Sequence, residues 1–463
     1  MRRSLLSVLV LFTVTVASQT IDDLDSVEAY YDSLDDSGDL DPISISSGSP
    51  DTIKFGTPGV GYHTKYGPIG GVQTDKINVE KLAITKVEYT NGILSDELMK
   101  SITSLQGRVE SIMQKNQNYS VTYTSKKPPN KNPHYYFSLA PYSWPNCKGK
   151  LFIKNPWTQC PWSSQDGKIN PAGKSLTSGH ALTYLIRDGV DLATSFYLFG
   201  NSSYEHKFTQ LMRTFFINSK TYMVPNMNYS QVVPDGPEND WEGSKMGVLD
   251  THGLLTLLSA TELVAQTNGS SWTAKDTYAL RSWIDKYRKW METSVLGKKE
   301  GEALNNHGTF YYAQLAGFSQ YIGDINGTRQ AVNKYLDTIY DGQIKADGSQ
   351  PLELKRQFSL HYSYYNLEAL GSMAKYAQSV GMDIWNVANS HNATYQTAVN
   401  FLIKNTLSTK NSENPANFLP MLETSANVYG DTSKYNYTSA ISTIRDQTAG
   451  GDLGAVWLLW TRQ

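Results

Sequence analysis

The sequence predicts an all-α protein in which helical hairpins form an α/α toroid or an incomplete barrel. From residue 95 onward, apolar residues recur at the three- and four-residue spacing of one helix face in many segments. Few segments alternate in the manner of a strand, and no strict repeat is present. Successive hairpins of this kind can close into a ring or stack as an open array, and periodicity alone does not decide between the two.

The composition is that of a globular chain. The 463 residues are 40% hydrophobic and 18% charged, which excludes a wholly disordered, collagenous or coiled-coil protein. Aromatic residues make up 12% of the chain. Such richness often accompanies carbohydrate binding, because flat rings stack on sugar faces, although an aromatic core gives the same composition.

Residues 1–17 are predicted to be a secretory signal peptide. Arg2 and Arg3 precede the apolar stretch Leu5–Val16, and small residues follow it. The stretch is shorter than the roughly 20 residues that span a membrane, which disfavours an anchor. Seven Asn-x-Ser/Thr sequons fit a secreted glycoprotein, so we expect an extracellular protein without a membrane partner.

Residues 18–90 are predicted to be largely irregular, with a short extended stretch at Leu82–Tyr89. Residues 1–51 hold ten acidic and only two basic residues, and Gly56–Gly71 is rich in Gly, Pro and Tyr. Neither part shows apolar periodicity. Residues 52–463 have 39 basic and 33 acidic residues, and this excess of positive charge favours an anionic partner. No basic run or binding module indicates nucleic acid.

Residues 91–463 are predicted to form the helical catalytic domain. The clearest apolar stripe is Leu280, Trp283, Ile284, Tyr287 and Trp290. The almost wholly apolar run Leu249–Val264 predicts a buried helix. Further helices are expected near residues 96–115, 176–199, 203–217, 309–322, 332–339, 364–380, 395–402, 417–428 and 452–461. Long loops separate them at 123–174 and 218–245, and loops often carry function.

Cys147 and Cys160 are the only two cysteines. In an oxidising compartment we expect them to form a disulfide that closes a short loop rich in Pro and Trp. Two free thiols or a metal pair are the alternatives. The histidines show no spacing typical of a metal enzyme, so neither a metal nor a cofactor is expected.

Two loops carry side chains suited to sugars. The loop at 134–146 offers Tyr142 and Trp144, whose rings can stack on sugar rings. The loop at 223–231 offers Asn226 and Asn228, whose amides both donate and accept hydrogen bonds. For each loop the alternative is ordinary packing against the core or a plain turn.

Two further segments carry hydrogen-bond donors and a phenol. The run 304–311 lies at the start of an expected helix, where anions are attracted, and contains Asn305, Asn306, His307 and Tyr311. The run 347–367 contains Arg356 and, six residues later, Tyr362. The alternatives here are a structural histidine, a solvated arginine and a packed tyrosine.

Together these segments resemble the alginate lyase superfamily of helical toroid polysaccharide lyases, from about residue 134 to 380. The resemblance rests on an Ala-Pro-Tyr-x-Trp-Pro loop, an Asn-Asn-His-Gly motif and an Asp-Gly-Ser-Gln-Pro-x-Glu-Leu block followed by Arg and Tyr. It implies that Asn306 and His307 neutralise a substrate carboxylate, that Arg356 assists them, and that Tyr362 is the catalytic tyrosine. The spacing from Arg to Tyr is more similar to the glucuronan lyase-like branch, whereas Ser143 stands where many members have a second aromatic residue.

The resemblance implies a lyase that cleaves a β-1,4-linked polyuronate, glucuronan or polymannuronate, by β-elimination. Separately, we expect a monomer. The proton on C5 is alpha to a carboxylate, so donors and a cation must stabilise the additional negative charge that develops. In these sugars H5 and O4 lie on the same ring face. One tyrosine can therefore act as base and then as acid if neighbouring positive charge lowers its usual pKa of about 10.

Two other function classes compete with the lyase. A glycoside hydrolase on a helical toroid needs a pair of carboxylic acids. One loop offers four candidates, Asp235, Glu238, Asp240 and Glu242. A non-catalytic carbohydrate-binding protein would keep the aromatic residues and lose the tyrosine or the histidine.

Overall fold

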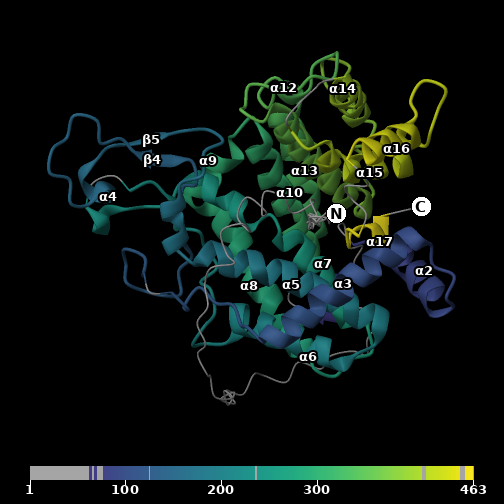
Figure 1. Cartoon of the computed structure of the whole chain (residues 1–463), viewed down its shortest axis with the longest axis horizontal. Coiled ribbons are helices and arrows are strands. Elements are labelled where there is room, and N and C mark those ends of the chain that lie inside the picture. The colour runs from purple at the N-terminus through teal and green to yellow at the C-terminus, as the bar shows by residue number, and fades with distance from the viewer. Residues whose placement is uncertain are drawn as a thin grey trace, which may run out of the picture.

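The computed structural model describes residues 62–64, 67–69, 77–124, 126–234, 237–408, 413–448 and 454–461. Most of these residues are helical (Figure 1), as the sequence predicted. The helices are α2 (Val79–Thr90), α3 (Asp96–Lys115), α4 (Pro156–Gln159), α5 (Ser178–Phe199), α6 (Ser202–Met212), α7 (Leu254–Gln266), α8 (Ala274–Thr293), α9 (Val295–Gly301), α10 (Asn306–Tyr321), α11 (Ile325–Tyr335), α12 (Asp341–Gln343), α13 (Ser359–Ser379), α14 (Tyr395–Ser408), α15 (Leu419–Tyr429), α16 (Tyr437–Gln447) and α17 (Leu458–Thr461).

Shorter elements lie between the helices. The 3-10 helices are η1 (Pro171–Ser175), η3 (Glu238–Asp240), η4 (Lys245–Thr251) and η6 (Pro415–Phe418), and the π-helical segments are η2 (Arg213–Ile217) and η5 (Leu336–Tyr340). The strands are β1 (Tyr62–Thr64), β2 (Gly67–Ile69), β3 (Phe137–Leu139), β4 (Ser143–Pro145), β5 (Trp162–Ser164) and β6 (Tyr229–Val232). They pair only two by two, antiparallel in β1–β2 and β4–β5 and parallel in β3–β6.

Local sequence explains the long helices. Helix α8 begins with a capping box, in which the Thr273 hydroxyl accepts from the Asp276 amide and the Asp276 carboxylate accepts from the Thr273 amide. Its predicted stripe faces inward, since Leu280, Trp283 and Ile284 are buried. Apolar faces of this kind join into one main core that includes residues of most of the helices.

The helices form a closed ring of hairpins. Seven inner helices contact one another in sequence, α3 with α5, then α7, α10, α13, α15 and α17, and α17 returns to α3. Outer helices pack against this ring, among them α6 on α5, α11 on α10, α14 on α13 and α16 on α15. The predicted α/α toroid is therefore confirmed, and the described helices close it.

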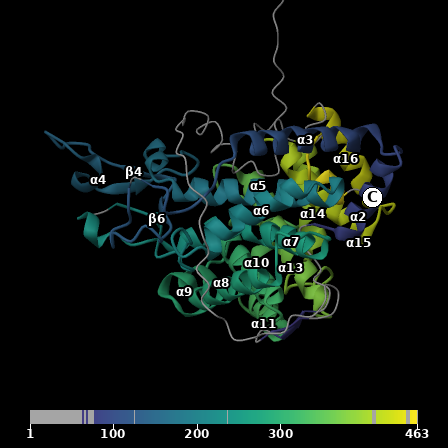
Figure 2. The same ribbon diagram turned by 90° about the horizontal axis from the view of Figure 1, so that it is seen from below.

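The two ends of the described chain complete the ring. Figures 1 and 2 both show α2 and α3 beside the C-terminal helices α15–α17. The Thr85 hydroxyl donates to the Leu459 carbonyl at 2.9 Å, and the Lys81 ammonium donates to the Asn427 amide oxygen at 2.9 Å. The extended stretch predicted at Leu82–Tyr89 is therefore wrong, because these residues lie within helix α2. Before α2, the structure describes only the β1–β2 hairpin and residues 77–78 of the N-terminal segment.

An arm projects from one side of the ring (Figure 1). It contains β4, β5 and α4, and the predicted disulfide between Cys147 and Cys160 closes its end with a Cα–Cα distance of 5.1 Å. Among the described helices, none is both long enough and apolar enough to cross a membrane.

Candidate active site

A cavity of about 1360 Å³ occupies the middle of the ring. Its walls come from the inner helices, and the loops that carry β3, β4 and β5 form one side of its mouth. All four predicted catalytic residues line it, as do the predicted binding residues Tyr142 and Asn305. The toroid thus brings together segments that lie more than two hundred residues apart in the sequence.

Tyr362 lies in the first turn of α13 and is 7% exposed. Its hydroxyl oxygen is 3.0 Å from that of Tyr142, within hydrogen-bonding distance. The Arg356 guanidinium carbon lies 3.6 Å from the centroid of the Tyr362 ring. The Tyr362 ring is therefore in direct contact with the positive charge of Arg356.

Asp166 holds the Arg356 guanidinium in place. Its carboxylate accepts from Nε at 3.0 Å and from Nη2 at 2.7 Å, and it also accepts from the Gln357 amide. These bonds lower the pKa of Asp166. Burial acts to lower the pKa of Arg356, but the bond to Asp166 and the proximity of Tyr362 raise it, and the net shift is upward. Arg356 is therefore a fixed cation at the cavity wall.

Asn306 and His307 begin helix α10, whose unpaired amides and dipole attract anions. The buried Glu353 carboxylate accepts from the Asn306 backbone amide at 2.7 Å and from its side-chain amide at 2.6 Å. Burial raises the pKa of Glu353, although the bonds from Asn306 oppose this effect. The preceding residue, Asn305, lines the cavity and makes no side-chain capping bond to α10.

The His307 imidazole is oriented by a second buried carboxylate. Its Nδ1 lies 2.5 Å from Oε1 of Glu300, whose side chain is 1% exposed. Because a carboxylate only accepts, Nδ1 carries the proton in this bond. Nε2 is then the ring nitrogen left for a ligand in the cavity.

A buried polar chain joins the two helix starts that carry these residues. Gln343 donates to the Thr309 hydroxyl at 2.7 Å, Thr309 donates to the Asn366 amide oxygen at 2.6 Å, and Asn366 donates to Gln350 at 2.7 Å. The Gln350 amide in turn donates to the carbonyl of Ser363, next to Tyr362. Because all these groups are satisfied at low dielectric, the network fixes α10 against α13.

The comparison with protein families identifies the chain. Residues 120–413 match the family model described as alginate lyase. The chain belongs to the alginate lyase family. It is therefore a polysaccharide lyase, and the predicted family and enzyme class are confirmed. No curated protein sequence matches the chain.

Several solved structures of alginate lyases are similar to this family member, and the first of them supports its fold. An alginate lyase from Bacteroides ovatus is 23% identical with a TM-score of 0.74, and the match covers 83% of this chain and 99% of that one. A His→Ala variant of alginate lyase A1-III complexed with a tetrasaccharide is 13% identical with a TM-score of 0.50, over 85% and 97%. Alginate lyase A1-III from Sphingomonas species A1 is 14% identical with a TM-score of 0.49, over 85% and 97%.

Three predicted binding residues lie outside the cavity of this lyase. Trp144 donates its indole N–H to the Lys168 carbonyl at 2.8 Å. Asn226 is buried, and its side-chain oxygen accepts from the Asn228 backbone amide at 3.2 Å. The Asn228 side-chain oxygen accepts from the Trp290 indole at 3.0 Å. These hydrogen bonds hold the three side chains within the protein, and their role in substrate binding stays a prediction.

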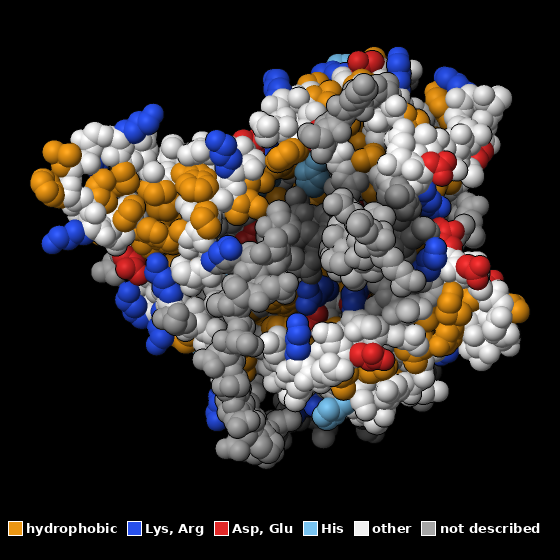
Figure 3. Space-filling view, viewed as in Figure 1, with side chains coloured by type: hydrophobic (Ala, Val, Ile, Leu, Met, Phe, Trp, Pro, Cys, Tyr) orange, Lys and Arg blue, Asp and Glu red, His pale blue; other side chains and the backbone are white. Residues whose placement is uncertain are grey.

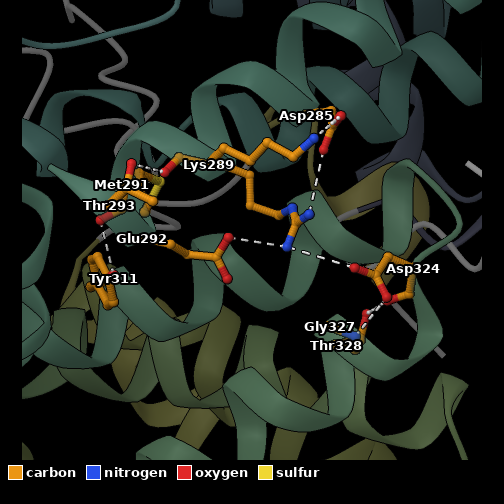
Figure 4. Close-up of polar contacts among 10 residues, drawn as sticks. Asp285, Lys289, Met291, Glu292, Thr293, Tyr311, Asp324, Gly327 and Thr328 are labelled. Atoms are coloured by element: carbon orange, nitrogen blue, oxygen red, sulfur yellow. Dashed lines mark hydrogen bonds and ion pairs between the residues drawn. The ribbon is translucent and has the colours of Figure 1, made fainter.

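Tyr311 is also a packing residue in this structure. It is 5% exposed and does not line the cavity. Its hydroxyl donates to the carbonyl of Met291 at the end of α8 (Figure 4). Tyr311 lies five residues beyond the start of α10, where the side chain packs against α8 and α9. Its role in substrate binding stays a prediction.

The structure describes three of the four carboxylates that a hydrolase could use. Glu238, Asp240 and Glu242 do not line it. Asp235, the fourth candidate, lies outside the described residues.

Sequence reasoning missed the acids that hold the donors, namely Asp166, Glu300 and Glu353. Glu353 stands inside the Gln-Pro-x-Glu-Leu block, so that motif contained a signal for it. Glu300 precedes His307 by seven residues across a helix boundary, and Asp166 is 190 residues from Arg356. Nothing in the local pattern marks those two, because only the tertiary fold brings them to their partners.

Proposed function

We propose that this family member is a secreted lyase that cleaves β-1,4-linked polyuronate, glucuronan or polymannuronate, by β-elimination. One observation carries the proposal. The Tyr362 phenol touches the Arg356 guanidinium in the cavity that Asn306 and His307 also line. The complex of alginate lyase A1-III with a tetrasaccharide supports a sugar chain as the ligand of such a ring.

The donors act on the uronate carboxylate. The side chains of Asn306, His307 and Arg356 would surround it, and helix α10 would add the positive end of its dipole. When the C5 proton leaves, negative charge spreads into this carboxylate. Preorganised donors stabilise that charge, and the loss of one donor costs about 10²–10³ in rate in other enzymes.

Tyr362 would move the proton. As a phenolate it takes H5 and forms an O–H bond, while the C5 electron pair delocalises into the carboxylate as an enolate. This pair then forms the C4–C5 double bond as the C4–O4 bond breaks, and the new phenol gives its proton to O4. The Tyr142 hydroxyl, 3.0 Å from the Tyr362 oxygen, can donate a hydrogen bond to the phenolate and stabilise it.

The finer substrate assignment rests on the sequence. The six-residue spacing between Arg356 and Tyr362 favours glucuronan, and the net positive charge of residues 52–463 favours a polyanion. The predicted signal peptide and the disulfide between Cys147 and Cys160 support secretion.

Product analysis on purified polysaccharides tests the proposal. The purified enzyme is incubated with glucuronan, polymannuronate and polyguluronate, and unsaturated uronate is followed by its ultraviolet absorbance. Carboxyl-reduced polymannuronate is the matched control, because it keeps the linkage and lacks the acidifying carboxylate. We expect absorbance only with an intact polyuronate. New reducing ends without absorbance would indicate hydrolysis and contradict the proposal.

A further inference from the structure

The arm, defined here as residues 143–165, begins and ends at the active site. Tyr142 precedes its first residue and contacts Tyr362, and Asp166 follows its last residue and holds Arg356. The strand β5 lines the cavity with Trp162, Ser163 and Ser164. A ligand that leaves the cavity at this mouth therefore meets the base of the arm.

The tip of the arm exposes two large apolar side chains. Leu151 is 83% exposed and Phe152 is 94% exposed, the highest values among the large hydrophobic residues described. Phe152 has a φ of 57°, a left-handed conformation that is costly for a bulky residue. The disulfide between Cys147 and Cys160 encloses this tip. Figure 3 shows hydrophobic side chains gathered over the arm, with basic side chains at its margin.

The arm is also uniformly basic. Residues 143–165 include Lys148, Lys150 and Lys154 and contain no Asp or Glu. All three lysines are exposed. Next to the arm, the Lys126 ammonium lies 4.0 Å from the Trp157 ring centroid and adds a further positive charge. The exposed ring of Phe152, which lies between Lys150 and Lys154 in the sequence, offers a stacking face for a sugar, and the lysines offer cations for its carboxylates.

We propose that the arm is an accessory binding surface for an anionic polysaccharide and holds the part of a polyuronate chain that extends beyond the catalytic cavity. The inference rests on the proposed function for the identity of the polymer. Its chemistry requires a chain that carries carboxylates at regular intervals and pyranose faces between them. Such a surface raises the affinity for long chains and leaves the chemical step unchanged.

Two arm variants test this surface. The triple variant Lys148→Ala/Lys150→Ala/Lys154→Ala removes the charge, and Leu151→Ser/Phe152→Ser removes the apolar tip. The matched control, Lys100→Ala/Lys334→Ala/Lys404→Ala, removes the same charge from exposed helical positions that do not line the cavity. Thermal unfolding and free-thiol assays establish that each variant is folded with its disulfide intact.

Affinity for polymer and turnover of short chains are measured separately. Each variant is combined with Tyr362→Phe and run in native gels that contain polyuronate or a neutral glucan. We expect the arm variants to raise the dissociation constant for polyuronate on the order of tenfold, with the control variant unchanged. With Tyr362 intact, the arm variants should raise KM for polymer and leave kcat on a uronate tetrasaccharide unchanged.

The possible failures are distinct. If polyuronate in the gel slows both arm variants as much as it slows the parent protein, the accessory surface is overturned, even if the enzyme cleaves polyuronate. Loss of binding to anionic phospholipid vesicles, with polymer affinity retained, would overturn it in favour of a membrane-facing surface. If the parent protein cleaves no polyuronate, the proposed function fails, and the gels still decide whether the arm binds an anionic polymer.

Discussion

Each donor at the cavity wall is held by its own carboxylate. Asp166 fixes Arg356, while Glu300 and Glu353 fix the side chains at the start of α10. Because a carboxylate only accepts hydrogen bonds, it orients the donor group that it contacts. The donor side chains are therefore already oriented in the folded protein, and they need little rearrangement during the reaction.

The substitution Tyr362→Phe tests the proton carrier. It removes one oxygen and keeps the ring that packs under Arg356, so folding and polymer binding should persist. If Tyr362 is both base and acid, kcat should fall by about 10³ or more, since the loss lies in the transition state. Turnover is measured by product absorbance and binding by calorimetry with polyuronate. Near-normal turnover on every cleavable polyuronate would refute the tyrosine mechanism.

Glu353→Gln tests the orientation of Asn306. The carboxylate accepts with Oε1 from the Asn306 backbone and with Oε2 from its side chain, and in glutamine one of these acceptors becomes an NH2 donor that faces an N–H group. Hydrogen bonds to charged groups contribute about 1.5–3 kcal/mol, and we expect kcat/KM to fall roughly 10- to 100-fold. Substrate titrations of the parent and the variant give this ratio. An unchanged kcat/KM would show that Asn306 needs no such anchor.

The same substitution should change how stability depends on pH. Burial raises the pKa of Glu353 above its usual value of 4.5, so the folded protein binds this proton more tightly than the unfolded chain. Glu353 therefore contributes a loss of stability as pH rises from 4.5 through its higher folded pKa. Relative to the parent, Glu353→Gln should gain unfolding free energy between pH 4 and pH 7. Denaturant titrations at both values measure this, and a relative loss would contradict the assignment.

At the scale of single elements, the motif glycine Gly308 allows α10 to begin where it does. A Cβ at this position would lie 1.9 Å from the Ala303 carbonyl oxygen and 2.8 Å from a methyl carbon of Ile339. Gly308→Ala should therefore displace the first turn, which carries Asn306 and His307. We expect a loss of about 1–3 kcal/mol in unfolding free energy together with a loss of activity.

Gly342→Ala is the matched control for this change. A Cβ at Gly342 meets nothing within 4 Å, and the residue is exposed within helix α12. The exchange there should be neutral or stabilising by about 0.5–1 kcal/mol. Denaturant unfolding and product absorbance are measured for both variants. Equal behaviour of the two would show that the close contact at Gly308 is not limiting.

Elements with strong local signals were predictable from sequence. The spacing of apolar residues located α3, α8 and α10 closely, and the capping residues Ser95 and Thr273 explain two of the starts. Helix α2 was not predicted because its buried face is small, with only Leu82 and Thr85 buried. Its stability depends on contacts with α17, which is distant in the sequence. Helices α9 and α16 are short and lack a long stripe, so their stability comes from neighbours.

The candidate site divides in the same way. Residues in contiguous motifs, Asn306, His307, Arg356 and Tyr362, were predicted and all line the cavity. Aromatic and amide residues chosen for their type alone, such as Trp144 and Asn228, were not separable from packing residues by sequence. Their partners, the Lys168 carbonyl and the Trp290 indole, are distant in the chain, and only tertiary contacts assign those side chains.

At the scale of the whole molecule, closure of the ring creates the cavity. The contact of α17 with α2 and α3 joins the ends of the described chain, and ion pairs reinforce it, as between Arg445 of α16 and Glu97 of α3 at 3.6 Å. Helix α2 packs on α17, and Trp460 and Thr461 of α17 line the cavity. Substitutions that loosen the packing of α2 should therefore alter the shape of the cavity wall.

Deletion of residues 19–51 tests the role of the acidic segment. It removes ten acidic residues and no basic residue, and its sequence shows no pattern that forms a core. The negative charge of the segment would repel a polyuronate, and such repulsion is screened beyond about 10 Å at 0.1 M salt. We therefore expect the deletion variant, with its signal peptide kept, to fold and to show equal or higher kcat/KM at low salt. The difference should disappear at high salt. Loss of folding, or lower activity at low salt, would show instead that the segment contributes to the folded body or to substrate capture.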